Sequence, residues 1–233
     1  MTNPLDTAIH VLDVPARPDP AKLIERFRMP RGIERLKAQA GEMVERAIAA
    51  ARPRALYRAA PAKVIDRDTV EVAGVRLASR SLSRNLEDQG TVFPFLATVG
   101  PELDDLPLPP GSLTLNFYLD TVKNAVLMAA VDYLGQHIRE EYGLGGIAHM
   151  NPGEIPDWPI GEQTPLFSLF EGHEKDIGVE LKPSGVMKPV KSRSGIIFPN
   201  EAGFVTCFLC TNARCPGRRA RYDEARVLEY TGP

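Results

Sequence analysis

The sequence predicts an α+β fold built on an antiparallel sheet. Strand-like and helical segments do not alternate regularly along the chain, which argues against a doubly wound parallel sheet. Residues 113–142 have the pattern of one long helix, apolar nearly all round from Val122 to Leu134, as expected for a helix central to a domain. Short β-branched runs bounded by turn residues occur on both sides of it. We therefore expect strands before and after one central helix.

The N-terminal part combines an arm, two helices and a hairpin. Residues 1–20 are rich in Pro and Asp and predict an extended arm, either a first edge strand or a loosely docked terminus. Asp19 is a candidate N-cap for a helix that begins at the following proline. A second helix is expected over 33–51, where apolar residues recur every three or four positions. Over residues 54–75 the hydrophobic period changes from helical to strand-like and predicts a hairpin that turns at 66–68.

The remaining elements follow from hydrophobic period and from turn residues. The glycines at 143–146 are expected to end the long helix. Residues 145–159, rich in Gly and Pro, predict a loop, and ordered loops of this kind often carry function. The other predicted elements are a helix over 79–90, a strand over 92–99, a short helix over 161–170, strands over 177–181 and 195–198, and a closing helix over 223–230.

Length and composition are those of an ordinary globular protein. The chain has 233 residues, of which 43% are hydrophobic and 25% charged, and it is long enough to bury a substantial core. We expect one domain over 1–233, with an arm and helices over 1–60 and a cysteine-containing segment over 200–233.

Charge and hydropathy exclude several classes of partner. The formal net charge of −2 provides no global field for nucleic acid or an anionic membrane. No stretch approaches the ~20 apolar residues that span a bilayer. Residues 1–19 lack the apolar core of a signal peptide. An odd number of cysteines fits a reducing compartment better than a disulfide framework, so we expect a cytoplasmic location.

All the cysteines lie within nine residues. Cys207, Cys210 and Cys215 have the spacing C-x2-C-x4-C, and a run of arginines follows them. Thiolates are soft ligands, so this spacing predicts either zinc or an iron–sulfur cluster, with one coordination position left for another ligand. The positive charges of the neighbouring arginines would lower the free-energy cost of placing an anionic cluster there. The alternatives are reduced surface thiols, or a strained disulfide between the first two cysteines with the third free.

Two further segments are candidates for ligand binding, and no residue is predicted to be catalytic. The first is the Gly/Pro-rich loop, where polar side chains could face a ligand: His149, Asn151, Glu154, Asp157 and Trp158. The second is the turn-rich segment 187–195, whose donors could hold phosphate, carboxylate or amide groups: Lys188, Lys191, Ser192, Arg193 and Ser194, followed by Gly195. The plainer interpretation of the second segment is an exposed basic loop.

Three blocks of sequence resemble a known family. They are VDYLGQHIREEYG in the long helix, HMNPGEIPDWPIGEQTPLFSLF after it, and IGVELKPSGVMKPVKSRSGIIFP. In order and spacing they are similar to the activation (reactivation) domain of vitamin B12-dependent methionine synthase, in a stand-alone form. The resemblance covers roughly 93–199, and the first third of the chain matches only loosely.

The resemblance implies a fold and a function. The fold would be a twisted antiparallel sheet with helices. The function would be reductive methylation, in which S-adenosylmethionine and an electron restore an oxidised cobalamin to its active methylated state. The cobalamin would be carried by a partner corrinoid methyltransferase, such as a methionine synthase lacking its activation domain, because this chain has no corrinoid-carrying D-x-H-x-x-G motif.

The sequence departs from the family at the ligand motif. Family members hold S-adenosylmethionine with R-P-A-P-G-Y-P. Here His149 takes the place of the Arg, Pro152 and Gly153 are kept, and the Tyr is either lost or displaced by an insertion. A histidine cannot replace a bidentate arginine clamp on a carboxylate. The three-cysteine stretch is an addition to the family pattern.

Three hypotheses are compatible with these features. In the first, an iron–sulfur cluster on the cysteines supplies the electron for cobalt, and S-adenosylmethionine supplies the methyl group. In the second, the chain is a non-catalytic docking module for a corrinoid protein, with a structural zinc at the cysteines. In the third, it is a methyltransferase subunit that acts on another substrate, with the corrinoid as carrier.

Overall fold

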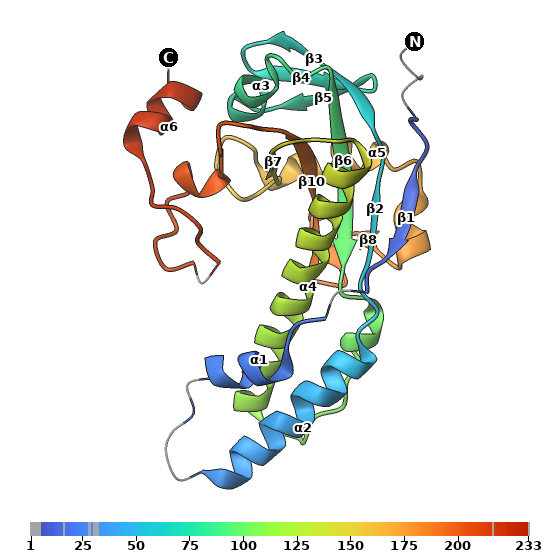
Figure 1. The fold of residues 1–233 in the computed structure, drawn as a ribbon, viewed down its shortest axis with the longest axis vertical. Helices are drawn as coiled ribbons and strands as arrows, with labels where there is room; N and C mark the ends of the chain where they lie inside the picture. Colours follow the sequence, from blue (N-terminus) through green and yellow to red (C-terminus); the bar gives the residue numbers. More distant parts are fainter. Residues whose placement is uncertain (1–5, 16, 28, 30–32, 216, 233) are drawn as a thin grey trace.

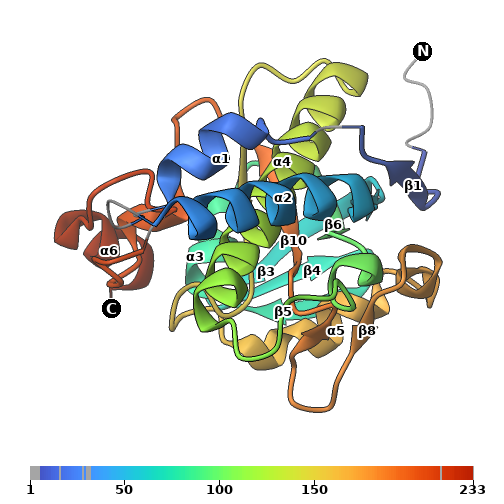
Figure 2. The same cartoon turned by 90° about the horizontal axis from the view of Figure 1, so that it is seen from below.

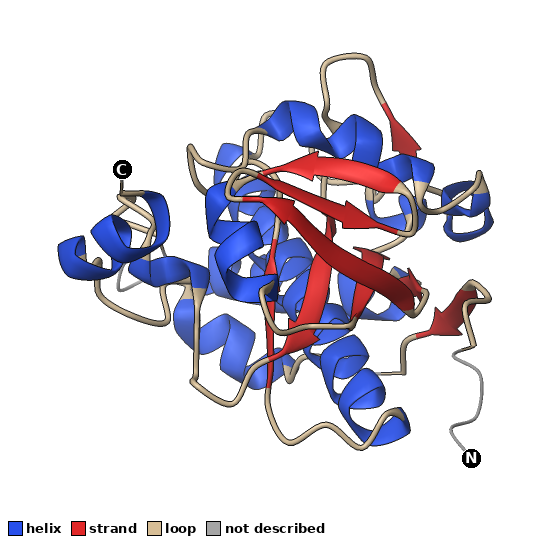
Figure 3. Ribbon diagram, turned by 90° about the horizontal axis from the view of Figure 1, so that it is seen from above, coloured by secondary structure: helices blue, strands red, loops and turns tan. Residues whose placement is uncertain are grey.

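An eight-stranded, wholly antiparallel sheet is the centre of the fold in a computed structural model that describes residues 6–15, 17–27, 29, 33–215 and 217–232. Helices lie on both sides of the strands (Figure 3). This arrangement confirms the predicted α+β class. In the described residues the strands are β1 His10–Asp13, β2 Arg54–Tyr57, β3 Ala60–Asp66, β4 Thr69–Val72, β5 Val75–Ala78, β6 Thr91–Thr98, β7 Ile147–Met150 and β10 Ser192–Pro199, with a separate pair β8 Glu180–Leu181 and β9 Met187–Lys188.

The helices follow the predicted order. Asp19 caps the first helix by accepting from the backbone N–H groups of Ala21 and Lys22, and Ser79 caps the third by accepting from that of Leu82. The α-helices are α1 Pro20–Arg26, α2 Glu34–Ala50, α3 Arg80–Leu86, α4 Leu113–Glu141, α5 Gln163–Ser168 and α6 Glu224–Thr231, and the 3-10 turns are η1 Pro101–Leu103, η2 Ile160–Glu162, η3 His173–Ile177 and η4 Thr206–Phe208.

Strand β6 organises the sheet. It pairs with β10 along one edge, and with β2 and β3 in succession along the other. Its alternating side chains enter two different cores, as the two-residue period of a strand requires. Phe93 and Phe95 pack with helices α2 and α4, whereas Val92 and Leu96 pack with α3, α5 and the β3–β5 meander.

Helix α4 joins two ends of the molecule. Its first turns pack with α1 and α2, and its last turns pass the sheet near β7 and β10 (Figures 1 and 2). It is buried on several sides, at Val122, Val126, Ala130 and Leu134 among others. The central helix predicted from its continuous apolar character is therefore confirmed. No helix in the described residues is long and apolar enough to cross a membrane.

The predicted loop over 145–159 is partly wrong. Its first residues form β7, which pairs antiparallel with β10, and His149 lies opposite Ile197. The predicted strand over 177–181 is also mostly wrong, because His173–Ile177 is a 3-10 turn and only Glu180–Leu181 is strand. Strand β10 is longer than the predicted 195–198 because β6 provides partners as far as Ser192.

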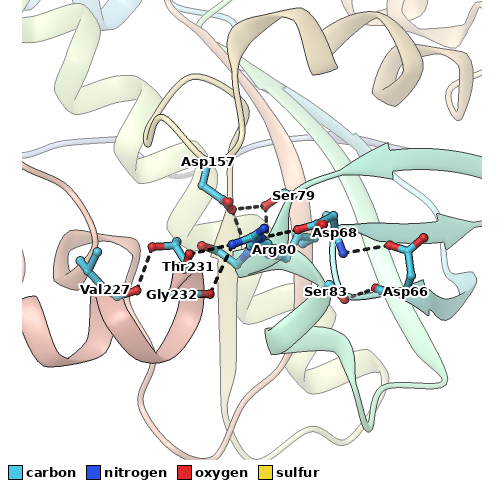
Figure 4. Close-up of polar contacts among 11 residues, drawn as sticks. Asp66, Asp68, Ser79, Arg80, Ser83, Asp157, Val227, Thr231 and Gly232 are labelled. Carbon is cyan, nitrogen blue, oxygen red and sulfur yellow. Dashed lines mark hydrogen bonds and ion pairs between the residues drawn. The ribbon is translucent and has the colours of Figure 1, made fainter.

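The C-terminal segment docks on the third helix through side-chain contacts (Figure 4). Arg80 pairs with Asp68 and donates to the carbonyl oxygens of Thr231 at 3.0 Å and Gly232 at 3.3 Å, which lie at the end of α6. Asp157 accepts from the hydroxyl of Ser79 at 2.7 Å and from the N–H of Ser81 at 2.8 Å. These bonds connect the start of α3 with two segments distant in sequence.

Candidate functional site

A cleft of about 290 Å³ lies where α4 passes the edge of the sheet. One wall is the face of α4 made by residues 132, 135, 136 and 139, whose spacing of three and four brings them together. Gly135 allows the helix to approach β7, since a Cβ there would lie 3.1 Å from Cδ1 of Ile147. The lining residues are Val131, Asp132, Gly135, Gln136, Arg139, Ile147, Ala148, His149, Ile197 and Arg219.

His149 is a neutral imidazole on the sheet side of the cleft. Its Nδ1 lies 2.8 Å from Oδ1 of Asn151, whose amide nitrogen donates to the carbonyl of Ser194 at 2.6 Å. That second bond fixes the amide, so Oδ1 accepts and Nδ1 carries the proton. Burial, with the nearby cations Arg193 and Arg219, lowers the pKa of His149 to about 4. The ring therefore offers Nε2 as a hydrogen-bond acceptor at neutral pH.

A half-buried ion pair supports the loop behind His149. Glu154 and Arg193 lie 3.3 Å apart, each with a side chain less than a third exposed. Burial raises the pKa of Glu154, and the Arg193 charge acts in the opposite direction. The hydroxyl of Thr206 donates to the carbonyl of His149 at 3.1 Å. The loop, β10 and the start of the cysteine-containing segment are thus bonded together behind the cleft.

The structure brings together only some of the side chains predicted to bind ligand. His149, Asn151, Ser194 and Gly195 meet at the β7–β10 edge, where a Cβ at Gly195 would lie 2.2 Å from the carbonyl oxygen of Met150. Ligand binding by these residues stays a prediction.

The other predicted residues have partners or positions away from the cleft. Asp157 contacts the start of α3, and Trp158 is fully buried. The Ser192 hydroxyl donates to the carbonyl of Pro189 and is hydrogen-bonded to the Thr98 hydroxyl, and Lys191 pairs with Asp120 at 2.9 Å. Pro152 is buried, while Gly153 and Lys188 are exposed. For these residues too, ligand binding stays a prediction.

Sequence reasoning missed four polar or charged lining residues as a group. Asp132, Gln136 and Arg139 follow one another on α4 at spacings of four and three and form a polar stripe, and this spacing was the available signal. Arg219 comes from the run after the cysteines, which indicated a metal environment rather than a cleft. Its side chain reaches Asp132, with Nη2 at 3.4 Å from Oδ1.

The three cysteines lie in the loop of residues 207–220, called here the cysteine loop. All three are free and half-buried. The Arg218 guanidinium donates to the carbonyl oxygens of Cys207, Cys210, Asn212 and Ala220 at 3.3, 2.6, 3.0 and 2.8 Å. Among the described residues, no group of three His, Cys, Asp or Glu side chains is placed to hold a metal ion. The donors therefore do not fit a metal or cluster in this arrangement.

Comparisons with known proteins indicate the fold. No family model and no curated protein matches the chain. Among solved structures, the chain is similar to the crystal structure of the MetH reactivation domain bound to AdoHcy, with a TM-score of 0.58. The match has 16% sequence identity and covers 88% of this chain and 82% of that one. The chain has the fold of that domain, as the three sequence blocks predicted.

Proposed function

We propose that this chain reactivates a corrinoid methyltransferase and that its cleft binds S-adenosylmethionine and S-adenosylhomocysteine. The observation that carries the proposal is the shared fold with a reactivation domain bound to AdoHcy, over 88% of the chain. S-adenosylhomocysteine is what remains of S-adenosylmethionine after its methyl group has left, so one cleft would hold both.

The cleft has the chemistry for part of such a ligand. Its charged side chains are Asp132, Arg139 and Arg219, and His149 adds a neutral acceptor. A cavity of about 290 Å³ is near the lower end of the ~300–1,000 Å³ of ligand pockets, so it suits one end of the ligand better than the whole. An open site of this kind would leave the methyl group accessible to a separate protein.

The chain's own residues would bind and orient the methyl donor. Cobalamin on the partner, when reduced, supplies the nucleophile that takes the methyl group from the sulfonium, which becomes a thioether. The α4 stripe and Arg219 would hold the donor by its charged end, and the wall of Ile147, Ala148 and Ile197 would exclude water from one side.

The source of the electron that reduces the partner's cobalamin is a separate question from methyl-donor binding. Arg218 holds the cysteine loop through four carbonyl groups, and the thiols do not converge. The proposal therefore does not depend on an iron–sulfur cluster or a zinc ion, which stay predictions. Iron, sulfide and zinc analysis of protein purified without air, with Cys210→Ser as the comparison, tests them.

Binding and reactivation can be measured separately. Isothermal titration of the full chain with S-adenosylhomocysteine should give saturable binding with a Kd below about 1 mM. Reactivation is measured with a methionine synthase that lacks its activation domain and whose cobalamin has been oxidised to the +2 state. Its activity should recover when this chain, S-adenosylmethionine and a low-potential chemical reductant are added. Omission of S-adenosylmethionine is the control and should abolish recovery. A chain that binds neither ligand contradicts the proposal. Partner binding without S-adenosylmethionine dependence would favour the docking module.

A further inference from the structure

The cysteine loop contributes one charged side chain to the cleft. Arg219 is held at its backbone, where its N–H donates to Sγ of Cys207 at 3.3 Å. Its guanidinium lies 3.4 Å from Asp132 of α4, so the pair joins two segments that are 87 positions apart in sequence. Both side chains line the cleft, and they are 46% and 66% exposed.

This ion pair contributes little to folding. Exposed pairs of this kind stabilise a protein by about 0–1 kcal/mol, because water screens the charges and side-chain entropy opposes a fixed geometry. The pair can therefore open at small cost when a ligand offers better partners. The Glu154–Arg193 pair in the same region is more enclosed, so a ligand would have less access to it.

An α-amino acid group has charges complementary to this pair. Its carboxylate can accept bidentate hydrogen bonds from the guanidinium of Arg219, and its ammonium group can pair with the carboxylate of Asp132. Arg139 lies two helical turns from Asp132 on the same face and adds a second cation to the lining. The position of the family's arginine is taken by His149, which is neutral and cannot bind a carboxylate in that way.

We propose that Asp132 and Arg219 together recognise the amino-acid end of S-adenosylmethionine and S-adenosylhomocysteine. The cysteine loop is the element that positions Arg219. This inference rests on the proposed function, since it assigns one part of the same ligand to named residues.

The loop is built to hold that residue in place. The Arg218 side chain binds the carbonyls of Cys207 and Cys210 before Arg219 in the chain and that of Ala220 directly after it. The Cys207 thiol then fixes the Arg219 N–H. The backbone of Arg219 is therefore restrained on both sides, which lowers the entropy lost when its side chain binds an anion.

Two ligands separate recognition of the amino-acid end from recognition of the nucleoside. 5′-Methylthioadenosine has the same nucleoside and a thioether, but lacks the amino and carboxylate groups of S-adenosylhomocysteine. Calorimetric titration of the full chain with each ligand should show that Arg219→Ala weakens S-adenosylhomocysteine binding about 10-fold or more. The affinity for 5′-methylthioadenosine should change less than about 2-fold. Arg219→Lys should restore part of the loss, and Asp132→Asn should weaken the same ligand about 3- to 10-fold.

The matched control is Arg221→Ala, an exposed arginine two residues further on that does not line the cleft. It should leave both affinities unchanged. Unaltered S-adenosylhomocysteine binding by Arg219→Ala, or an equal loss for both ligands, overturns the inference while leaving the proposed function intact. Failure of the unaltered chain to bind either ligand overturns the proposed function itself, and the inference with it.

Discussion

The two sides of the cleft are held by different kinds of force. On the sheet side, β7 and β10 form a continuous ladder, and Ile196 and Phe198 pack into a core with Trp158. On the other side, the cysteine loop is anchored in the same core by Leu209, and beyond it by one guanidinium on four carbonyl groups and by the contacts of Arg219. Buried apolar area supports the first side, whereas the cysteine loop beyond Leu209 is supported by hydrogen bonds to exposed or half-exposed segments.

This difference in support suggests a different role in ligand binding for each side of the cleft. Regions with few buried apolar contacts open locally at low free-energy cost, whereas core strands open only when the domain unfolds. The β7–β10 edge would therefore present His149 from the core, and the cysteine loop would present Arg219 from a backbone that hydrogen bonds restrain but that can open without the core. Substitutions on the two sides should affect unfolding and ligand binding in different proportions.

The largest effect is expected at Trp158. The side chain is 0% exposed and packs in the core beneath the β7–β10 edge. Trp158→Ala should lower the free energy of unfolding by about 3–5 kcal/mol, measured by urea denaturation, because it leaves a large cavity. Trp158→Phe keeps most of the volume and should cost about 1–2 kcal/mol.

The same pair of variants tests the predicted ligand role of Trp158. If the residue acts through packing alone, Trp158→Phe should bind S-adenosylhomocysteine as the unaltered chain does. If a well-folded Trp158→Phe variant lost affinity for S-adenosylhomocysteine, Trp158 would contribute to ligand binding as well as to packing. Such a loss would also show that the sheet side does more than provide a fixed edge.

A smaller effect on stability is expected from His149, and it depends on pH. Its pKa is about 4 in the folded protein, against the usual 6.5. Between these values the unfolded chain binds a proton that the folded protein does not, so stability decreases as pH falls from about 6.5 to about 4 and is constant above that range. The loss over this range should be on the order of 3 kcal/mol.

Urea denaturation at a series of pH values measures this dependence. His149→Gln removes the titrating group and should flatten the profile over that range. The exposed His173→Gln is the matched control and should keep the slope of the unaltered chain. An unchanged slope in His149→Gln would mean that the ring is solvated, and that the sheet side of the cleft is looser than its hydrogen bonds indicate.

Much of the sheet and helix framework could be predicted because its signals are local. The apolar run of α4, the Asp19 cap and the apolar strand β6 each appear within one segment of sequence. Strand β7 was missed because four residues between glycines and a proline are too few to establish a two-residue period. It is a strand because β10, more than 40 positions away, supplies its partners.

The cleft could not be predicted as a unit, because its parts meet only through the fold. His149 was singled out by its place after a glycine-rich turn, but nothing local connects it with Asp132 or Arg219. The cysteine spacing indicated a metal site because spacing alone does not show where thiols point. The neighbouring Arg218 has donors that bind the loop's carbonyl groups, and this role depends on how the loop curls around it.

The smallest effect on global stability is expected from Arg218, together with a clear local one. Arg218→Ala removes the hydrogen bonds to Cys207, Cys210, Asn212 and Ala220, but exposes little apolar surface. The free energy of unfolding should fall by less than about 1 kcal/mol, because the loop beyond Leu209 opens while Leu209 stays in the core. Amide hydrogen exchange across 207–220 should rise about 10-fold or more, and S-adenosylhomocysteine affinity should fall about as much as in Arg219→Ala, because the positioned arginine is released.

Hydrogen exchange read by mass spectrometry, with Arg221→Ala as the control, decides whether the two sides are independent. Faster exchange confined to the cysteine loop would establish it as a separate unit that serves ligand binding. Faster exchange that extended through β7 and β10, with a loss of stability comparable to that of Trp158→Ala, would contradict the division. The Thr206 bond to the carbonyl of His149 would then be the path by which the loop supports the sheet, because it is the contact that ties β7 to the start of the cysteine-containing segment.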